Sequence, residues 1–404
     1  MKYVIFIPDG SSDYPLEELD GKTPLEVADT PNIDRLAKKG LGGFTNNVPS
    51  KFTPGSDVAN MSIFGYNPDG CYTGRGPLEA GNMEIETSDN DVIFRCNTIT
   101  EKDNTMHDFN AGHITSEESE ILLNDLNEYF NEKYDDFKGK FYPGISYRHL
   151  FVYSFDNKED ADRIANLETM PPHDIVGENL DENTDWDDEA ALLIRQIMWE
   201  AREFLKDHEV NRKRDIPANM IWLWGQGKTP QLPDFTERYG LSGAVITGVD
   251  LLKGIGIFAG LDIIEVPGAT GFFDTDYEAK GRYAIEALKN HDLVFIHVEA
   301  PDEAGHAGDL EEKIKAIERI DKYIVGPVLD FLEGSDYKAA ILPDHPTPIE
   351  VKTHTRDDVP VIMYSTTNEK TDSVEEFSEK GVENGSVEKR DGHLLIQRLI
   401  DDDF

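Results

Sequence analysis

The stretch Leu293-Val-Phe-Ile-His-Val-Glu-Ala-Pro-Asp-Glu-Ala-Gly-His306 decides the fold. Its first six residues, Leu293–Val298, form a short and largely apolar run that is typical of a buried parallel strand. Asp302 and His306 follow and are four residues apart, so on a helical turn their side chains point the same way. The stretch therefore predicts a strand whose carboxyl end presents a carboxylate and an imidazole.

Two other apolar runs also end in acidic residues. Asp9 follows the run Tyr3–Ile7. Asp344 and His345 follow a run nearer the C-terminus, and His354 comes shortly after them. Because the carboxyl ends of parallel strands meet at one edge of a sheet, we expect these carboxylates and imidazoles to gather there. Such a group needs cations for neutralisation, and mixed oxygen and nitrogen donors suit Mn²⁺ or Zn²⁺ better than Ca²⁺.

Strand-like runs alternate with helical patterns along most of the chain, which predicts an α/β fold with helices flanking a parallel sheet. Pro31–Lys39 is one such helix, with Thr30 as its N-cap and Gly40 at its end. The remaining expected strands are Met220–Trp224, Gly243–Thr247, Ala339–Leu342 and Pro360–Tyr364. The remaining expected helices are Val249–Ala259, Asp276–Leu288, Leu310–Leu332 and a last one around His393–Ile400.

The segment from Val92 to Arg214 differs in character from the rest of the chain. It contains two amphipathic helical patterns, Ser116–Tyr129 and Asp187–Asp207, with polar and aromatic-rich connections. We therefore expect residues 92–214 to form a smaller inserted domain, and residues 1–91 and 215–404 to form the core. The stretch Thr366–Gly392 is low in apolar residues, which predicts a mobile surface loop.

The composition narrows the classes of function. The chain has 404 residues, of which 38% are hydrophobic, as is typical of a globular protein. Its 80 acidic and 39 basic residues give a net charge of −41, which repels a nucleic-acid backbone. The sequence has no apolar run long enough for a membrane span or a signal peptide. The two cysteines, Cys71 and Cys96, suit a reducing compartment. We therefore expect a cytoplasmic protein that binds neither nucleic acid nor membrane.

Ser56 follows a Pro-Gly turn and precedes a helical pattern. A hydroxyl at a helix N-terminus lies beside backbone N–H groups and the positive end of the helix dipole, both of which favour a phosphate. On the local sequence alone, an ordinary N-cap serine is the simpler interpretation. With divalent metals nearby, a metal would lower the pKa of the hydroxyl and make Ser56 a competent nucleophile.

Together these motifs resemble those of the archaeal-type cofactor-independent phosphoglycerate mutases of the alkaline phosphatase superfamily. The resemblance implies an alkaline-phosphatase-like core and an α/β insertion that binds substrate and closes over the site, which keeps water away. It covers almost the whole chain, and six separated motifs occur in the family's order: Pro8-Asp9-Gly10, Pro54-Gly-Ser56-Asp, Tyr72-Thr-Gly-Arg-Gly-Pro-Leu-Glu-Ala80, Pro301-Asp-Glu-Ala-Gly-His306, Pro343-Asp-His345 and Thr353-His354-Thr355.

The resemblance also implies a reaction and two sets of metal ligands. Ser56 would accept the phosphoryl group of 3-phosphoglycerate and return it to the 2-hydroxyl of the reoriented glycerate, so no bisphosphoglycerate is needed. Mn²⁺ is the expected metal, and Zn²⁺, Co²⁺ or Mg²⁺ could occupy the same ligands. One metal would be held by Asp302, His306 and His354, and the other by Asp9, Ser56, Asp344 and His345.

One position departs from the family pattern and leaves the substrate open. Many mutases of the superfamily have a histidine just after the nucleophile, where this chain has Ala59-Asn60. A sister group with Ala-Asn at that place is regarded as a proposed homoserine kinase. Phosphoryl transfer to homoserine, metal-dependent phosphomonoester hydrolysis and a non-catalytic binding role therefore stay as alternatives. The sequence also leaves the oligomeric state open.

The substrate that the resemblance implies is a small phosphorylated carboxylic acid, so cations must bind it within a strongly acidic protein. Basic residues inside motif-rich turns are the candidates, although each could instead be an ordinary ion-pair partner at the surface. The expected substrate-binding residues are Arg148, His173 and Lys228, with Arg75 and His113 as weaker candidates.

Overall fold

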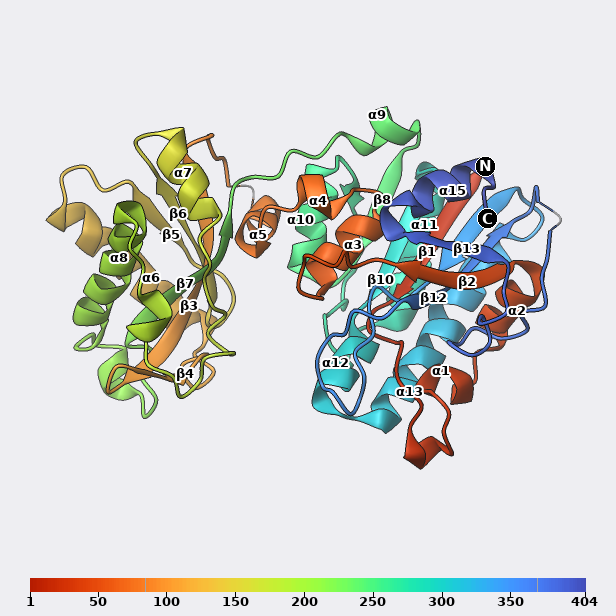
Figure 1. The fold of residues 1–404 in the computed structure, drawn as a ribbon, viewed down its shortest axis with the longest axis horizontal. Coiled ribbons are helices and arrows are strands. Elements are labelled where there is room, and N and C mark those ends of the chain that lie inside the picture. Colours follow the sequence, from red (N-terminus) through yellow and green to blue (C-terminus); the bar gives the residue numbers. More distant parts are fainter. Residues whose placement is uncertain (84, 369) are drawn as a thin grey trace. The chain divides into compact units, whose positions relative to one another are not determined.

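The computed structural model describes residues 1–83, 85–368 and 370–404, and these form two compact units. The first unit comprises Met1–Tyr72 and Gln231–Phe404, and the second comprises Thr73–Pro230. In each unit, helices pack on a sheet (Figure 1). None of the helices described has the length and apolar character that a bilayer crossing requires.

The first unit is built on a sheet of eight strands in the order β13-β2-β12-β11-β1-β10-β8-β9. Neighbouring strands are parallel, except that β12 runs antiparallel to both of its neighbours. These strands are β1 (Lys2–Pro8), β2 (Leu41–Asn46), β8 (Gly243–Ile246), β9 (Asp262–Ile263), β10 (Leu293–Val298), β11 (Tyr337–Ile341), β12 (Val359–Ser365) and β13 (Val387–Asp391).

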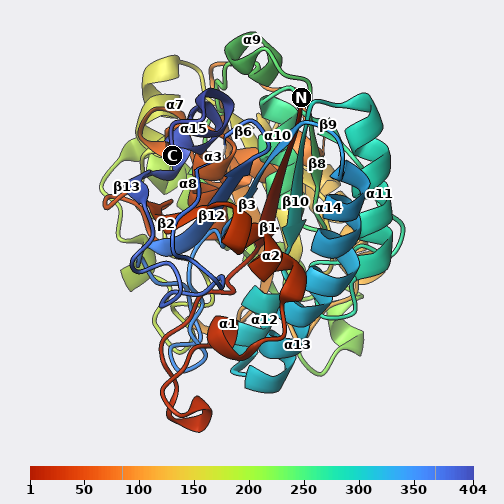
Figure 2. The ribbon, with the colours of Figure 1, turned by 90° about the vertical axis from the view of Figure 1, so that its right-hand side faces the viewer.

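Helices cover both faces of this sheet, which explains why its central strands are apolar on both sides (Figure 2). Val4 and Phe6 share a buried cluster with α2, α11, α13 and α14. On the opposite face, Phe295 contacts Phe64 at the end of α3, with ring centroids 4.4 Å apart. The helices and short turns are η1 (Glu17–Leu19), α1 (Pro24–Val27), α2 (Pro31–Lys39), α3 (Ser56–Ile63), α4 (Pro68–Cys71), α9 (Phe235–Tyr239), α10 (Asp250–Phe258), α11 (Tyr277–Asn290), α12 (Ala300–Ala307), α13 (Leu310–Ile320), the π-helical η4 (Asp321–Val325), α14 (Gly326–Leu332), η5 (Gly392–Leu394) and α15 (Leu395–Asp401).

The second unit is an antiparallel sheet of five strands with its own apolar core. Leu122, Leu126 and Phe130 lie on one face of α6, and Ile194 and Met198 on one face of α8, so both helices bury an apolar stripe against the sheet. The elements are α5 (Arg75–Asn82), β3 (Asp91–Lys102), β4 (Thr105–Asp108), α6 (Ser116–Lys133), β5 (Gly139–Tyr142), β6 (Arg148–Ser154), α7 (Lys158–Ala165), η2 (Glu182–Thr184), α8 (Glu189–Leu205), η3 (Asn211–Lys213) and β7 (Met220–Gly227).

The α/β class with helices flanking a largely parallel sheet is confirmed. The helix Pro31–Lys39 is α2 as expected, but Thr30 makes no side-chain capping bond. Asp321 in η4 accepts hydrogen bonds from the backbone N–H groups of Asn32 and Ile33 instead, at 2.9 and 2.7 Å. The cap therefore comes from a residue far away in the sequence, and it ties α2 to the α13–α14 segment.

The stretch Thr366–Gly392 is not a plain loop, and that prediction was wrong. β13 lies within it and pairs in parallel with β2. Val374, Phe377 and Val382 are buried in the main core although they are isolated in a polar sequence. Three separated apolar residues are enough to anchor the stretch because the sheet supplies the backbone partners. Residue 369 lies outside the described residues.

The second unit extends beyond residues 92–214 at both ends. Met220–Trp224 is a strand as expected, but it belongs to β7, which pairs antiparallel with β3 and not with the parallel sheet. α5, which precedes residue 92, contacts both β3 and β7. The prediction that residues 92–214 form a substrate-binding domain remains a prediction.

Candidate active site

Three carboxylates meet where neighbouring strands end in the first unit. β1 lies between β10 and β11, and Asp9, Asp302 and Asp344 follow these three strands. All three side chains are buried. Asp344 Oδ1 accepts hydrogen bonds from the backbone N–H of Gly10 at 3.2 Å and from that of His345 at 2.8 Å. The convergence expected from the strand ends is therefore present.

The three predicted histidines join these carboxylates. His345 Nε2 lies 3.3 Å from Asp344 Oδ2. His306 Nε2 lies 3.2 Å from Asp302 Oδ2, and His354 Nε2 lies 3.5 Å from Asp302 Oδ1. The Nε2 atoms of His306 and His354 are only 3.0 Å apart. Two imidazole nitrogens facing each other beside one carboxylate suit a shared divalent cation.

Burial, repulsion between carboxylates and hydrogen bonds from histidines together set the pKa values in this cluster. Burial and the neighbouring charge of Asp344 raise the pKa of Asp9 well above its usual value. Burial also raises the pKa of Glu299, next to β10, to about 8. Burial raises the pKa of Asp302 as well, but hydrogen bonds from His306 and His354 outweigh it and hold that pKa well below its usual value. So many buried carboxylates are stable together only with cations beside them.

Ser56 is the first residue of α3 and is 9% exposed. Its Oγ lies 3.1 Å from His345 Nε2 and 3.5 Å from Asp9 Oδ2. Asn60, one turn along α3, donates to the Ser56 carbonyl at 2.9 Å and to Asp344 Oδ2 at 2.8 Å. The residue that departs from the family pattern therefore joins the nucleophile's helix to a predicted metal ligand.

The donor atoms fit divalent cations. Asp302, His345 and His354 form one group whose ligand atoms lie within 4.8 Å of one another, and Asp9, His297 and Asp344 form a second. A third group consists of the carboxylates Glu299, Asp302 and Glu303. Among the described residues, Asp9 Oδ1 has no hydrogen-bond partner although it is buried. A buried and unsatisfied carboxylate oxygen is costly unless a cation binds it.

His297 was not among the predicted residues. It lies inside β10, is fully buried, and its Nε2 is 2.7 Å from Asp9 Oδ2. The sequence signal was an imidazole in the middle of an apolar strand, which needs a polar partner. The resemblance places His345 in one ligand set with Asp9, Ser56 and Asp344. In the structure His345 contacts Ser56, but its ligand atom groups with those of Asp302 and His354.

A buried ion pair holds together the loops that follow β1 and β11. Lys313 Nζ on α13 lies 2.7 Å from Asp13 Oδ2, and both side chains are fully buried. The same ammonium donates to the Thr347 carbonyl at 2.8 Å. Loss of either partner would leave an unpaired buried charge, which costs about 3–5 kcal/mol. This pair therefore fixes the segment between His345 and His354.

Three of the predicted substrate-binding residues gather in the second unit around an arginine that was not predicted. The guanidinium of Arg95 on β3 lies 4.5 Å from the ring centroid of Trp224 on β7. Burial lowers the pKa of Arg95, and the charges of Arg75 and Arg148 lower it further. The carboxylate of Glu79 raises it. His173 contacts Trp224 with ring centroids 5.7 Å apart. Burial lowers the pKa of His173, the charges of Arg75 and Arg95 lower it further, and Asp174 opposes them, so its ring is neutral. We call Arg75, Arg95, Arg148 and His173 the cation cluster, in which the three arginines carry the charge.

The remaining two candidates lie elsewhere in that unit. Lys228 Nζ is paired with Asp162 on α7 at 2.6 Å. His113 is exposed in the turn before α6, with a φ of 52°. The structure thus brings together Arg75, Arg148 and His173. Lys228 is paired with Asp162, as Arg95 is paired with Glu79 at 3.2 Å and His173 with Asp174 at 3.7 Å.

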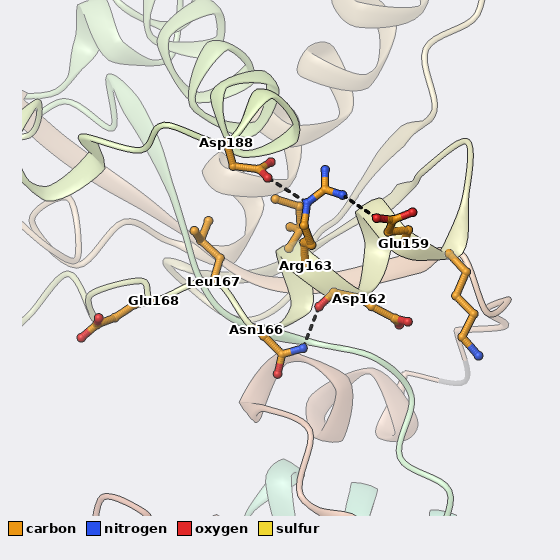
Figure 3. A pocket seen from close by; sticks show the side chains of 9 residues that line it. Glu159, Asp162, Arg163, Asn166, Leu167, Glu168 and Asp188 are labelled. Carbon is orange, nitrogen blue, oxygen red and sulfur yellow. Dashed lines mark hydrogen bonds and ion pairs between the residues drawn. The ribbon is translucent and has the colours of Figure 1, made fainter.

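A cavity of about 860 Å³ lies beside α7 and is lined by residues of α7, of the turn that follows it, and by Asp188 (Figure 3). Its lining includes Asp162, Arg163 and Asp188. Arg163 Nε is 2.8 Å from Asp188 Oδ2, and a second nitrogen is 3.8 Å from Glu159 Oε1. Carboxylates outnumber the two cations in its lining, Lys158 and Arg163, so this cavity is a poor site for an anionic substrate.

Comparisons with known proteins agree with the site. Residues 1–395 match the family model of the metalloenzyme superfamily. A protein of Methanothermobacter thermautotrophicus named 2,3-bisphosphoglycerate-independent phosphoglycerate mutase 2 is 50% identical, over 99% of this chain and 98% of its own. A solved structure of a Pyrococcus horikoshii protein is 30% identical with a TM-score of 0.83, and covers 99% of this chain and 96% of that chain. The solved cofactor-independent phosphoglycerate mutase of Thermoplasma acidophilum is 26% identical with a TM-score of 0.65, and covers 99% of both chains. The likeness therefore extends through both compact units.

Gly10 provides a test of how tightly the strand ends must approach. Its φ is +60°, and a Cβ there would lie 2.6 Å from both Asp302 Oδ1 and Thr347 Oγ1. Gly21 has a similar φ of +79° but open space around it. We predict that Gly21→Ala costs only the left-handed backbone strain of about 1–2 kcal/mol. Gly10→Ala should cost clearly more and also weaken Mn²⁺ binding, because Asp302 must move.

Denaturant unfolding of the metal-free proteins and Mn²⁺ titration of the folded ones measure the two effects separately. Equal stability losses and unchanged Mn²⁺ affinity in both alanine variants would show that close approach at Gly10 is unimportant.

Proposed function

Because the chain belongs to the metalloenzyme superfamily and, within it, to the 2,3-bisphosphoglycerate-independent phosphoglycerate mutases, we propose that it interconverts 3-phosphoglycerate and 2-phosphoglycerate through a phosphoserine at Ser56. One observation carries this proposal. Ser56 Oγ lies at a helix start, 3.1 Å from His345 Nε2 and 3.5 Å from Asp9 Oδ2, beside the clustered carboxylates and imidazoles. A hydroxyl in such surroundings is suited to attack phosphorus.

We propose that two divalent metals, most readily Mn²⁺, bind at this site. When bound, they would lower the pKa of the serine hydroxyl and neutralise the oxygens of the transferring phosphoryl group. The metal that serves the leaving oxygen would be held by Asp302, His306 and His354. The metal beside the nucleophile would be held by Asp9, Ser56, Asp344 and His345.

In the first half-reaction, Ser56 Oγ forms a bond to phosphorus while the bond from phosphorus to the 3-oxygen of the substrate breaks. Asp9 Oδ2 lies 3.5 Å from Ser56 Oγ and can accept the hydroxyl proton. His345 Nε2 lies 3.1 Å from Oγ, but it is no proton acceptor when its lone pair binds the metal. The 3-oxygen leaves as the hydroxyl of glycerate after taking up one proton.

The second half-reaction reverses the first at the neighbouring oxygen. The 2-hydroxyl of the reoriented glycerate attacks the phosphoserine, the bond from phosphorus to Ser56 Oγ breaks, and the serine regains its proton. The phosphoryl group stays on the protein between the two halves, so no bisphosphoglycerate is required. Backbone N–H groups at the start of α3 would stabilise the phosphate during that interval.

We propose that the cation cluster binds the carboxylate and phosphate of the substrate. Burial is the largest cause of the lowered pKa of Arg95, and the charges of Arg75 and Arg148 lower that pKa further, so these two residues destabilise its charged form. An anion bound among them would relieve this repulsion. In a protein of net charge −41, such a local cationic group is also what attracts an anionic substrate. The roles suggested for Lys228 and His113 in substrate binding stay predictions.

The nucleophile is tested with Ser56→Ala and with Ser62→Ala as a matched control on the same helix. Ser62 is buried, and the hydrogen bonds of its hydroxyl among the described residues are to the backbone carbonyls of Asn47 at 2.7 Å and Val58 at 3.2 Å. With Mn²⁺ and 3-phosphoglycerate, and no bisphosphoglycerate, Ser56→Ala should lower kcat by about 10⁴-fold or more. Ser62→Ala should retain most of the turnover in the same coupled enolase assay.

Full turnover in Ser56→Ala would contradict the phosphoserine mechanism. A metal-loaded wild-type protein that is inactive on 3-phosphoglycerate, yet phosphorylates homoserine with ATP, would contradict the choice of substrate. Hydrolysis of phosphomonoesters without mutase activity would do the same.

The cation cluster is tested with Arg148→Gln and Lys140→Gln. Both cations are exposed on the same sheet and lie over tyrosine rings, Arg148 at 5.9 Å and Lys140 at 4.7 Å from the centroids. Loss of a charge-assisted contact of about 1.5–3 kcal/mol should raise KM of Arg148→Gln about 10- to 100-fold, with kcat changed less. Lys140→Gln should keep the wild-type KM. A KM for Arg148→Gln equal to that of the control would remove Arg148 from the substrate site.

A further inference from the structure

A chain of hydrogen bonds crosses the ends of three neighbouring strands in the first unit. Thr247 follows β8, His297 lies in β10, and Asp9 follows β1. Thr247 Oγ1 is 3.1 Å from His297 Nδ1, and His297 Nε2 is 2.7 Å from Asp9 Oδ2. The three side chains are 4%, 0% and 0% exposed, so water does not compete for these bonds.

The chain has a defined direction. The backbone N–H of Val249 donates to Thr247 Oγ1 at 3.1 Å, so the hydroxyl already accepts one hydrogen bond and is free to donate its own hydrogen to His297 Nδ1. The imidazole then carries its hydrogen on Nε2 and donates it to Asp9 Oδ2. When Asp9 is ionised, as a metal ligand must be, the opposite tautomer would place a nitrogen lone pair 2.7 Å from a carboxylate oxygen, which is repulsive.

The two carboxylate oxygens of Asp9 differ in their hydrogen bonding. Oδ2 accepts the imidazole hydrogen, whereas Oδ1 is buried and has no hydrogen-bond partner among the described residues. Asp344 differs, because both of its oxygens accept from the protein, Oδ1 from Gly10 and Oδ2 from Asn60. The imidazole therefore fixes the rotation of the Asp9 carboxylate and leaves one oxygen for a cation.

We propose that His297 and Thr247 are positioning residues for Asp9: together they orient its carboxylate and set its affinity for a divalent metal. This inference rests on the proposed function only in taking Asp9 as a metal ligand. Hydrogen-bonded partners of metal ligands commonly change metal affinity by about 10- to 100-fold.

Direct ligation by His297 is the competing explanation, because its ring nitrogen groups with Asp9 and Asp344 within 4.8 Å. The contact of 2.7 Å between Nε2 and Asp9 Oδ2 favours the positioning role. Two ligand atoms bound to one ion at about 2.0–2.2 Å in tetrahedral geometry lie more than about 3 Å apart. The observed separation is that of a hydrogen bond.

The test measures Mn²⁺ and Co²⁺ affinity by competition with a chromophoric chelator, on the full-length protein and its variants. Thr247→Val removes the hydroxyl and keeps the shape, whereas Thr247→Ser keeps the hydroxyl. His297→Leu removes the donor to Asp9, whereas His297→Gln keeps an N–H group at the Nε2 position. Thr100→Val and His149→Leu are matched controls in the second unit, where Thr100 is also 4% exposed and donates to the Pro217 carbonyl, and His149 is 2% exposed.

We expect affinity to fall about 10- to 100-fold in Thr247→Val and at least as much in His297→Leu. Thr247→Ser and His297→Gln should stay within about threefold of wild type, as should both controls. The visible absorption spectrum of the Co²⁺-loaded His297→Gln protein should match that of wild type, because the metal would keep the same ligands. Circular dichroism and thermal unfolding confirm that each variant is folded, and Thr247→Val is informative even where His297→Leu fails to fold.

Equal affinities in Thr247→Val and Thr100→Val would overturn the positioning role. If His297→Gln lost as much metal affinity as His297→Leu and its Co²⁺ spectrum changed, the positioning role would be overturned in favour of direct ligation by His297. Asp9→Ala separates these failures from failure of the proposed function. Wild-type affinity in Asp9→Ala would remove the premise that Asp9 binds metal, whereas loss of affinity there with no effect at Thr247 would reject the positioning role alone.

Discussion

The repulsion among buried carboxylates at the ends of β1, β10 and β11 is the constraint on which the rest of the site depends. Asp9, Asp302 and Asp344 are almost fully buried, and Glu299 lies beside them. Apolar packing on both faces of the sheet forces these strand ends together. Divalent cations turn that repulsion into affinity, which explains why the donor atoms converge without enough positive side chains to neutralise them.

The surrounding residues hold these carboxylates in place through contacts that do not neutralise the carboxylate charge. Gly10 allows the first loop to pass close to Asp302, and Asn60 ties α3 to Asp344. The ion pair of Lys313 with Asp13 anchors the loop that follows β11. Ser56 then stands at the start of α3 with its hydroxyl aimed at the cluster. A phosphoserine mechanism needs this combination of a fixed nucleophile and preorganised charge.

Much of the site was predictable because strand ends in a parallel sheet converge wherever the chain places them in sequence. The local motifs therefore predicted that Asp9, Asp302, Asp344 and the three histidines would lie together, as they do, whereas their roles as metal ligands and that of Ser56 as nucleophile stay predictions. His297 and Arg95 could not, because one looks like part of an apolar strand and the other like an ordinary strand residue. Their partners, Asp9 and Trp224, are distant in sequence, so the signal exists only after folding. β13 and the cap that Asp321 provides to α2 could not be predicted for the same reason, because their partners are also distant in sequence.

The stereochemistry at phosphorus tests the central claim most directly. With 3-phosphoglycerate made chiral at phosphorus by oxygen isotopes, each in-line displacement inverts the configuration. Transfer to Ser56 followed by transfer to the 2-hydroxyl comprises two displacements, so the account predicts net retention in 2-phosphoglycerate. Net inversion would mean a single in-line displacement, such as transfer from one substrate molecule to another, and would contradict the phosphoserine intermediate.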